Sequence, residues 1–162
     1  MITAGVITVS DKGSAGQRED QSGPEVERIL ETVGVEVIRR AVVPDEIHLI
    51  RDSLVDFADH HKIDLIVTTG GTGVAPRDVT PDATLGVIDK EIPGMAEAMR
   101  RESYKITPHA LISRAVVGIR GRSLIVNLPG SPKGVRENLA VLLTALPHAI
   151  EKIKGDEREC AV

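Results

Sequence analysis

Short apolar runs alternate along this chain with longer segments of helical periodicity. Residues 6–9, 65–69 and 124–128 are β-branched or aliphatic at nearly every position, as in strands that are buried on both faces of a parallel sheet. In residues 26–33 the apolar positions instead follow the i, i+3, i+4, i+7 spacing of an amphipathic helix. The alternation predicts a single-domain α/β fold with a mostly parallel sheet and helices on both faces.

The same pattern extends over the whole chain. Strands are expected at 6–9, 35–43, 65–69, 115–119 and 124–128, and helices at 22–33, 44–58, 81–89, 95–105 and around 139–146. The glycines of the turn 118–121 predict a late hairpin at the sheet edge. We expect one domain over residues 1–155, a tail over 156–162, and a ligand site beyond the carboxyl ends of the strands.

The composition argues against several classes of protein. Phe57 and Tyr104 are the only aromatic residues and the net charge is −4, so nucleic acid is not an expected partner, since its binding uses stacking platforms and clustered basic residues. No apolar run approaches the length of a membrane span. The single cysteine, Cys160, can form no internal disulfide and suits a reducing compartment. These features predict a cytoplasmic protein.

The strand at 65–69 runs into a loop of Gly70, Gly71, Thr72 and Gly73. Glycines let backbone N–H groups approach an anion closely, so this loop is a candidate phosphate cradle, although an ordinary turn would also use glycines. No Gly-Lys-Ser/Thr follows, and the third glycine of a dinucleotide fingerprint would fall on Pro76. Neither known phosphate motif is therefore indicated.

Carboxylates and hydroxyls gather at the same expected edge. Ser10 and Asp11 follow the first strand, Asp45 follows the second, and Asp78 lies shortly after the glycine loop. Asp45 is also a good helix N-cap, with or without a role in binding, whereas Asp78 is either a ligand or an ordinary solvated residue. Thr80, just before a proline, is placed to cap the next helix.

Two further helix starts carry polar signals. Ser22 and Glu25 have the spacing of a capping box. Ser131 with Pro132 opens a helix whose N-terminus is either an anion site, helped by Lys133, or simply a well-capped end. The five histidines show no metal-ligand spacing, so a zinc site is not expected.

Seven segments, in matching order, resemble the MogA/MoaB family of molybdopterin-binding proteins. They are residues 9–11, 44–46, 68–73, 78–84, 91–94, 111–114 and 128–133. The resemblance covers nearly the whole chain, from about residue 2 to residue 154. It implies the MogA/MoaB-like fold and a role in molybdenum cofactor biosynthesis.

Members of the MogA type adenylylate molybdopterin with ATP and Mg²⁺ and release pyrophosphate, and the product passes to a molybdenum insertase. The family's two functional aspartates match Asp45 and Asp78, which the resemblance assigns to catalysis and to Mg²⁺. Its pterin and nucleotide contacts match two segments: Thr69, Gly70, Gly71, Thr72 and Gly73, and Pro129, Gly130, Ser131 and Pro132. Ser10 and Asp11 complete the expected binding residues.

Some MoaB-type relatives bind molybdopterin without catalysing, so a non-catalytic carrier is the alternative. The complete segment 78–84 favours the enzyme, whereas Ser131 stands where the MogA branch often carries an amide residue. The resemblance also implies a homotrimer, with a hexamer pointing to the MoaB branch. Because the terminal phosphate of molybdopterin is largely dianionic at neutral pH, the expected reaction needs charge neutralisation and positioning more than a strong base.

Overall fold

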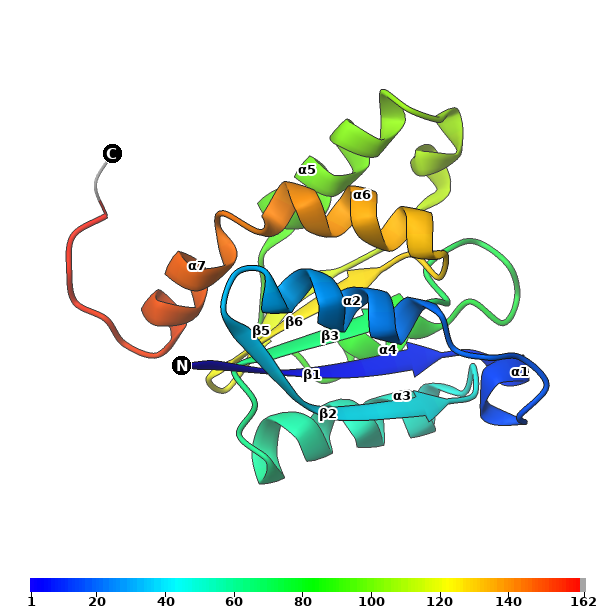
Figure 1. Cartoon of the computed structure of the whole chain (residues 1–162), viewed down its shortest axis with the longest axis horizontal. Coiled ribbons are helices and arrows are strands. Elements are labelled where there is room, and N and C mark those ends of the chain that lie inside the picture. Colours follow the sequence, from blue (N-terminus) through cyan, green and yellow to red (C-terminus); the bar gives the residue numbers. More distant parts are fainter. Residues whose placement is uncertain (161–162) are drawn as a thin grey trace.

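The computed structural model of this chain describes residues 1–160 and holds six strands in one sheet (Figure 1). Their order across the sheet is β2-β1-β3-β6-β5-β4. The strands are β1 (Ile2–Val9), β2 (Val35–Val43), β3 (Leu65–Thr69), β4 (Lys90–Glu91), β5 (Val117–Arg120) and β6 (Ser123–Leu128).

Four strands of the sheet are parallel, as predicted. β1 lies between β2 and β3, and β3 pairs with β6, so that Val67 lies beside Val6 on one side and Val126 on the other. The predicted hairpin forms between β5 and β6, with Gly121 in its turn at a φ of 56°. Its expected place at the sheet edge was wrong, because the unpredicted two-residue strand β4 pairs with β5 and forms that edge.

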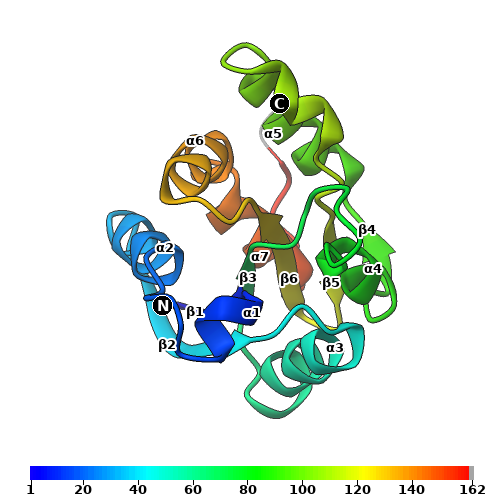
Figure 2. The same ribbon diagram turned by 90° about the vertical axis from the view of Figure 1, so that its right-hand side faces the viewer.

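Helices cover both faces of the sheet (Figure 2). They are α1 (Asp11–Ser14), α2 (Ser22–Glu31), α3 (Ile47–Val55), the π-helical turn η1 (Asp56–His60), α4 (Thr80–Leu85), α5 (Pro93–Tyr104), the 3₁₀ turn η2 (Pro108–Ile112), α6 (Pro132–Leu142) and α7 (Leu146–Ile153). Among the described residues no helix is long and apolar enough to cross a membrane.

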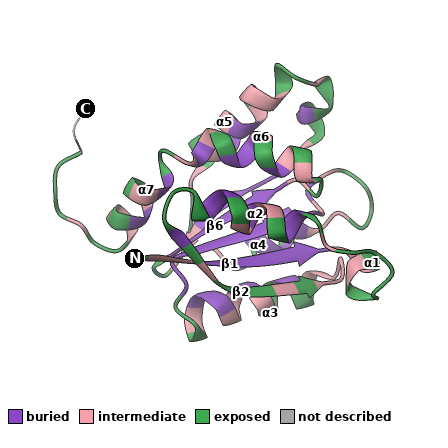
Figure 3. Cartoon of the chain, viewed as in Figure 1, coloured by how far each residue is buried: buried purple, intermediate pink, exposed green. Residues whose placement is uncertain are grey.

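The core has two layers, one on each face of the sheet (Figure 3). Leu65 and Val67 of β3 pack in the layer beneath α2, α5, α6 and α7, whereas Ile66 packs in the layer beneath α3, η1 and α4. All three are fully buried. Burial of alternate residues on both faces explains why β3 lacks the polar alternation of a half-exposed strand.

Several expected helix boundaries were wrong, among them the start of α3 at Ile47 instead of residue 44 and the end of α4 at Leu85 instead of residue 89. The C-terminal helix is two helices, because the chain turns at 143–145 and Leu146 begins α7. The segment 11–21, where no helix was expected, holds the short helix α1, whose N-cap Ser10 accepts a hydrogen bond from the N–H of Gly13. The capping box does not form, because Ser22 is already helical and its hydroxyl donates to the carbonyl of Gly130.

The parallel strands end together at one edge of the sheet. β1, β2, β3 and β6 finish at Val9, Val43, Thr69 and Leu128, on the side where α1 lies (Figure 1). The loops after these strands are therefore brought together. The boundary expected between a domain over 1–155 and a tail over 156–162 stays a prediction, and its last two residues lie outside the described part.

Candidate active site

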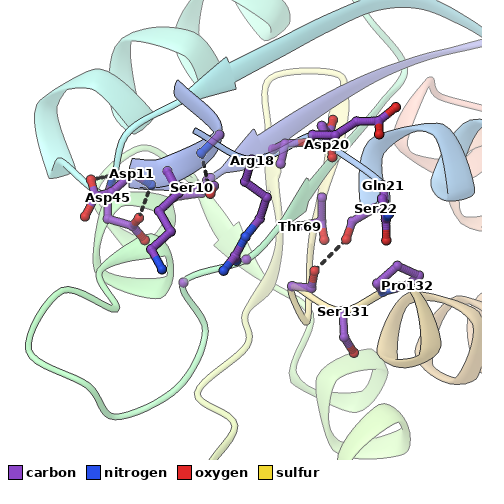
Figure 4. A pocket seen from close by; sticks show the side chains of 18 residues that line it. Ser10, Asp11, Arg18, Asp20, Gln21, Ser22, Asp45, Thr69, Ser131 and Pro132 are labelled. Atoms are coloured by element: carbon purple, nitrogen blue, oxygen red, sulfur yellow. Dashed lines mark hydrogen bonds between the residues drawn. The ribbon is translucent and has the colours of Figure 1, made fainter. Parts of the chain in front are cut away.

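A cleft of about 770 Å³ opens beyond the ends of β1, β3 and β6 (Figure 4). Nine of the residues predicted from the sequence line it: Ser10, Asp11, Asp45, Thr69, Gly70, Gly71, Gly130, Ser131 and Pro132. Its volume is typical of a site for a nucleotide-sized ligand. The cleft joins residues from four separate parts of the chain, as the carboxyl edge of a parallel sheet should.

The glycine loop adopts a backbone that requires glycine at its first two positions. Gly70 and Gly71 have φ angles of 103° and 68°, in the left-handed region that side chains disfavour. The N–H of Gly70 donates to the carbonyl of Leu128 at 3.1 Å, and a Cβ on Gly70 would collide with the carbonyl of Val9. The loop is thus packed directly against the ends of β1 and β6.

Three hydroxyl groups bind carbonyl oxygens of the two loops beside the cleft. Thr80 donates to Gly70 at 2.8 Å, Thr69 donates to Pro129 at 2.6 Å, and Ser22 donates to Gly130. Thr80 is therefore not the predicted cap of α4. It lies inside that helix, buried, and its hydroxyl is used to hold the glycine loop.

The N–H groups of the same loops have no acceptor within residues 1–160. This holds for Gly71, Thr72, Gly73, Gly130 and Ser131. Backbone N–H groups left in this way are the usual ligands of phosphate in nests and glycine-rich loops. With the carbonyl oxygens bound and the N–H groups unbound, the two loops favour an anion.

Asp45 and Asp11 are joined by two reciprocal hydrogen bonds. The N–H of Asp11 donates to Oδ2 of Asp45 at 2.9 Å, and the N–H of Asp45 donates to Oδ1 of Asp11 at 3.0 Å. The expected N-cap role of Asp45 was wrong, because α3 begins at Ile47 and its N-cap is Glu46, whose side chain makes no capping hydrogen bond. Tertiary contact with the end of β1 has replaced local capping.

The carboxyl group of Asp45 is partly buried in an acidic environment. Burial is the main cause that raises the pKa of Asp45, and the charges of Asp11 and Asp78 raise it further. In Asp11 a hydrogen bond from Arg77 lowers the pKa instead. A cation next to Asp45 would therefore favour its ionised form.

Arg77 was not predicted as a site residue, yet it holds this acidic pair. Its Nε donates to Oδ2 of Asp11 at 2.6 Å, and its Nη2 donates to Oδ1 of Asp11, to the carbonyl of Asp45 and to Oε1 of Glu46. One feature of the sequence could have indicated Arg77, since it is adjacent to Asp78 at the predicted ligand edge.

Asp78, which was also predicted as a site residue, does not line this cleft. Its Oδ2 accepts a hydrogen bond from the N–H of Ala75 at 3.0 Å and lies 2.8 Å from the point where a Cβ on Gly73 would be. Arg114, also missed, fixes this segment by donating to the carbonyls of Gly73 and Asp78. Asp78 is thus held against the back of the glycine loop.

The turn after β6 agrees with its sequence signal. Ser131 is the N-cap of α6, and its hydroxyl accepts a hydrogen bond from the N–H of Gly134 at 3.0 Å. Because Ser131 borders both this cleft and a second one, the helix start lies between the two cavities.

Two cations line the first cleft without an ion-pair partner among the described residues. They are Lys12, in α1, and Arg18, whose side chain reaches into the cleft between Asp45 and Thr69 (Figure 4). Asp20 borders the same space, but it accepts hydrogen bonds from Thr8 and Gly23. None of the three was predicted, because they lie in a polar segment that carries no recognisable motif.

A second cleft of about 340 Å³ lies across the loops from the first. Thr72, Gly73, Pro129 and Ser131, all predicted, form its near side. Its other walls combine apolar side chains of Ile106, Ala110 and Ile112 with polar and basic side chains, which are Ser103, Glu137, Asn138, Arg100, His109 and Lys133. The loops with unbound N–H groups therefore separate two cavities of different character.

The carboxylates suit a divalent cation that is shared with a ligand. No group of three or more His, Cys, Asp or Glu in the described part of the chain could hold a metal alone. Asp45 lies next to Gly71 and Asp78 lies next to Gly73, and within that part neither Oδ1 accepts a hydrogen bond. Such hard oxygens fit Mg²⁺, which usually takes its remaining ligands from waters and substrate phosphates.

Residues 5–148 match the family described as "Probable molybdopterin binding domain". A molybdopterin adenylyltransferase of Helicobacter pylori strain J99 is 43% identical over 157 residues, which cover 96% of this chain and 89% of the relative. The molybdopterin adenylyltransferase of Escherichia coli K12 is 39% identical, with coverage of 99% and 89%. The crystal structure of the molybdopterin biosynthesis enzyme MoaB from Thermus thermophilus superposes with a TM-score of 0.91 at 48% identity, covering 96% and 98%.

Proposed function

Because the chain belongs to the molybdopterin-binding domain family, we propose that it is a molybdopterin adenylyltransferase, which transfers AMP from ATP to the phosphate of molybdopterin and releases pyrophosphate. It is thus a nucleotidyltransferase of molybdenum cofactor biosynthesis. The observation that carries the proposal is the pair of loops whose N–H groups lack acceptors within residues 1–160, set between two clefts.

The two clefts offer different side chains, and each set suits one of the two substrates. ATP fits the larger cleft, where Lys12 and Arg18 supply positive charge for the phosphates. The pterin fits the smaller cleft, whose apolar walls suit a planar ring and whose polar side chains, among them Asn138 and Glu137, suit its hydrogen-bonding edge. The phosphates of the two substrates then meet at the loops that separate the clefts.

The reaction joins two anions, so positioning and neutralisation dominate its barrier. An oxygen of the molybdopterin phosphate attacks the α-phosphorus of ATP, and the bond from that phosphorus to the pyrophosphate oxygen breaks. The nucleophile needs no strong base, since the second pKa of a phosphate monoester is about 6. The N–H groups of 71–73 and 130–131 stabilise negative charge on the oxygens of the transferred group.

Asp45 and Asp78 are the residues that would hold Mg²⁺. Bound there, the ion supplies positive charge that offsets the phosphates. Asp45 is suited by its raised pKa, which a neighbouring cation would lower again, and Asp78 by its place next to Gly73 in the same loop, where its charge acts on Asp45. The protein's own contribution is to fix the two carboxylates beside the glycine loop, Asp45 next to Gly71 and Asp78 next to Gly73.

The test is to incubate the protein with ATP, Mg²⁺ and molybdopterin and to measure pyrophosphate and adenylylated molybdopterin. We expect one pyrophosphate for each molybdopterin modified, and none when either substrate is omitted. Tight molybdopterin binding without pyrophosphate release would contradict the enzyme and leave a carrier.

We further propose a homotrimer that works in the cytoplasm and delivers its product to a molybdenum insertase. Light scattering should return about three times the 17.4 kDa of one chain. A monomer would contradict the trimer, and a hexamer would favour the MoaB branch, to which the serine at position 131 also points.

A further inference from the structure

Arg77 connects three of the segments that surround the first cleft, those after β1, β2 and β3. It stands in the loop 70–79 and donates to Asp11, which follows β1, and to Asp45 and Glu46, which follow β2. The partners lie 66, 32 and 31 residues away in sequence. A single guanidinium thus ties the loop that carries Asp78 to the segment that carries Asp45.

These bonds contribute little to folding. The side chain of Arg77 is 57% exposed, and ion pairs between exposed side chains contribute little net stability because water competes for both charges. Arg77 also lines neither cleft. Its four bonds therefore serve the geometry of the acidic pair rather than the core or direct substrate contact.

The geometry depends on the shape of the guanidinium as well as on its charge. Nε and Nη2 grip both oxygens of Asp11, which leaves Oδ1 of Asp11 directed at the N–H of Asp45. The returning bond from the N–H of Asp11 then fixes Oδ2 of Asp45 and leaves Oδ1 toward Gly71. A lysine ammonium could balance the charge but could not make this planar, two-pronged contact.

We propose that Arg77 is a positioning residue for adenylyl transfer, which fixes the Asp45 carboxylate through Asp11 and couples it to the loop that bears Asp78. The inference rests on the proposed function. It assigns Arg77 no contact with either substrate and no proton transfer.

The test compares Arg77→Gln and Arg77→Lys with the matched control Arg120→Gln. Arg120 also grips one aspartate with two nitrogens, Asp59 at 3.0 and 2.6 Å, and donates to one carbonyl, that of Val87, but it lines neither cleft. We expect Arg77→Gln to lower kcat by about 10- to 100-fold, the usual cost of losing a group that orients a metal-binding residue. The KM for ATP should change little, and Arg120→Gln should keep the native kcat.

Arg77→Lys separates positioning from charge. We expect it to recover no more than about a tenth of the native kcat, because lysine lacks the fork. Full recovery, or a large rise in the KM for ATP with unchanged kcat, would show that Arg77 acts as a plain charge for phosphate and would overturn the proposal. An equal loss in Arg120→Gln would overturn it too, since the effect would then reflect general destabilisation.

Amide hydrogen exchange gives a readout that needs no activity. The N–H groups of Asp11 and Asp45 should exchange faster in Arg77→Gln than in the native protein, and at the native rate in Arg120→Gln. Unchanged exchange at both amides would refute the positioning role even if activity fell. Should the native protein release no pyrophosphate, the proposed function fails, and the exchange rates still decide whether Arg77 fixes the acidic pair.

Discussion

Replacing Asp45 with asparagine should lower kcat without lowering the stability of the fold. Asparagine keeps an oxygen that can accept the hydrogen bond from the N–H of Asp11, now 2.9 Å from Oδ2. It puts a neutral amide where the unbound Oδ1 of Asp45 lies near Gly71. We expect kcat to fall by about 100- to 1,000-fold, the usual cost of removing one electrostatic contact to a transition state. This loss corresponds to about 2.7 to 4 kcal/mol.

Stability should not fall in the same variant. Burial, followed by the charges of Asp11 and Asp78, raises the pKa of Asp45. A raised pKa in the folded state means that the ionised carboxylate destabilises the fold at every pH above its unfolded pKa. Asp45→Asn removes that charge, and no helix cap is lost because Glu46 is the N-cap of α3. The Tm at neutral pH should therefore stay the same or rise.

Asp59→Asn is the matched control. A hydrogen bond from Arg120 lowers the pKa of Asp59, so this carboxylate stabilises the fold at neutral pH. Its replacement should cost up to about 1 kcal/mol, as for a well-formed surface pair, and lower Tm by about 2–4 °C. Pyrophosphate release and calorimetry on both variants check the pair. Native activity in Asp45→Asn, or a fall in its Tm comparable to that expected for Asp59→Asn, would refute the reasoning.

Three further predictions follow from the site and the sheet. Asp78→Asn should lower kcat by about 100-fold or more and leave Tm nearly unchanged, because asparagine can still accept from the N–H of Ala75; retained activity would exclude it as a ligand of Mg²⁺. Thr80→Val should cost about 1–3 kcal/mol in urea unfolding, since it leaves the buried carbonyl of Gly70 without its donor, and it should raise the KM for ATP; an unchanged KM would show that the loop needs no such support. Although burial opposes it, a hydrogen bond from Thr3 and the ion pair with Lys154 hold the pKa of Asp64 below its ordinary 3.8. Its contribution is present above that pH and is lost as pH falls further, so Asp64→Asn should flatten the acid-side loss of unfolding free energy, measured from about pH 5 to about pH 3; an equally steep loss would contradict this.

The architecture could be predicted from the sequence because the spacing of apolar residues in each strand and helix reflects directly which of its faces are buried. Each strand that is apolar on both faces had to be covered on both faces, and that requirement led to the parallel sheet and its ligand edge. β4 escaped detection because two residues carry no periodicity. The break before α7 escaped because the leucines at 139, 142, 143 and 146 keep a helical spacing across the turn.

The errors in the predicted caps have one physical cause. Ser22, Asp45 and Thr80 all have side chains that favour helix starts, and local propensity assigned each to the nearest helix. In the fold each finds a partner from a distant segment: Gly130, Asp11 and Gly70. Cap propensity is worth about 1 kcal/mol, so a buried tertiary hydrogen bond of similar strength readily replaces it.

The same tertiary hydrogen bonds also account for the phosphate preference that we propose for these short loops. A peptide loop normally offers as many carbonyl acceptors as N–H donors, and the two would cancel as a ligand surface. Here the hydroxyls of Ser22, Thr69 and Thr80 bind three of the carbonyl oxygens, while the N–H groups of 71–73 and 130–131 keep no acceptor within residues 1–160. The loops therefore present donors with little competing negative potential. The proposed preference for an anion arises because the fold has already hydrogen-bonded the carbonyl oxygens of these peptides and not their N–H groups. Only the assembled fold determines which of the two groups is hydrogen-bonded.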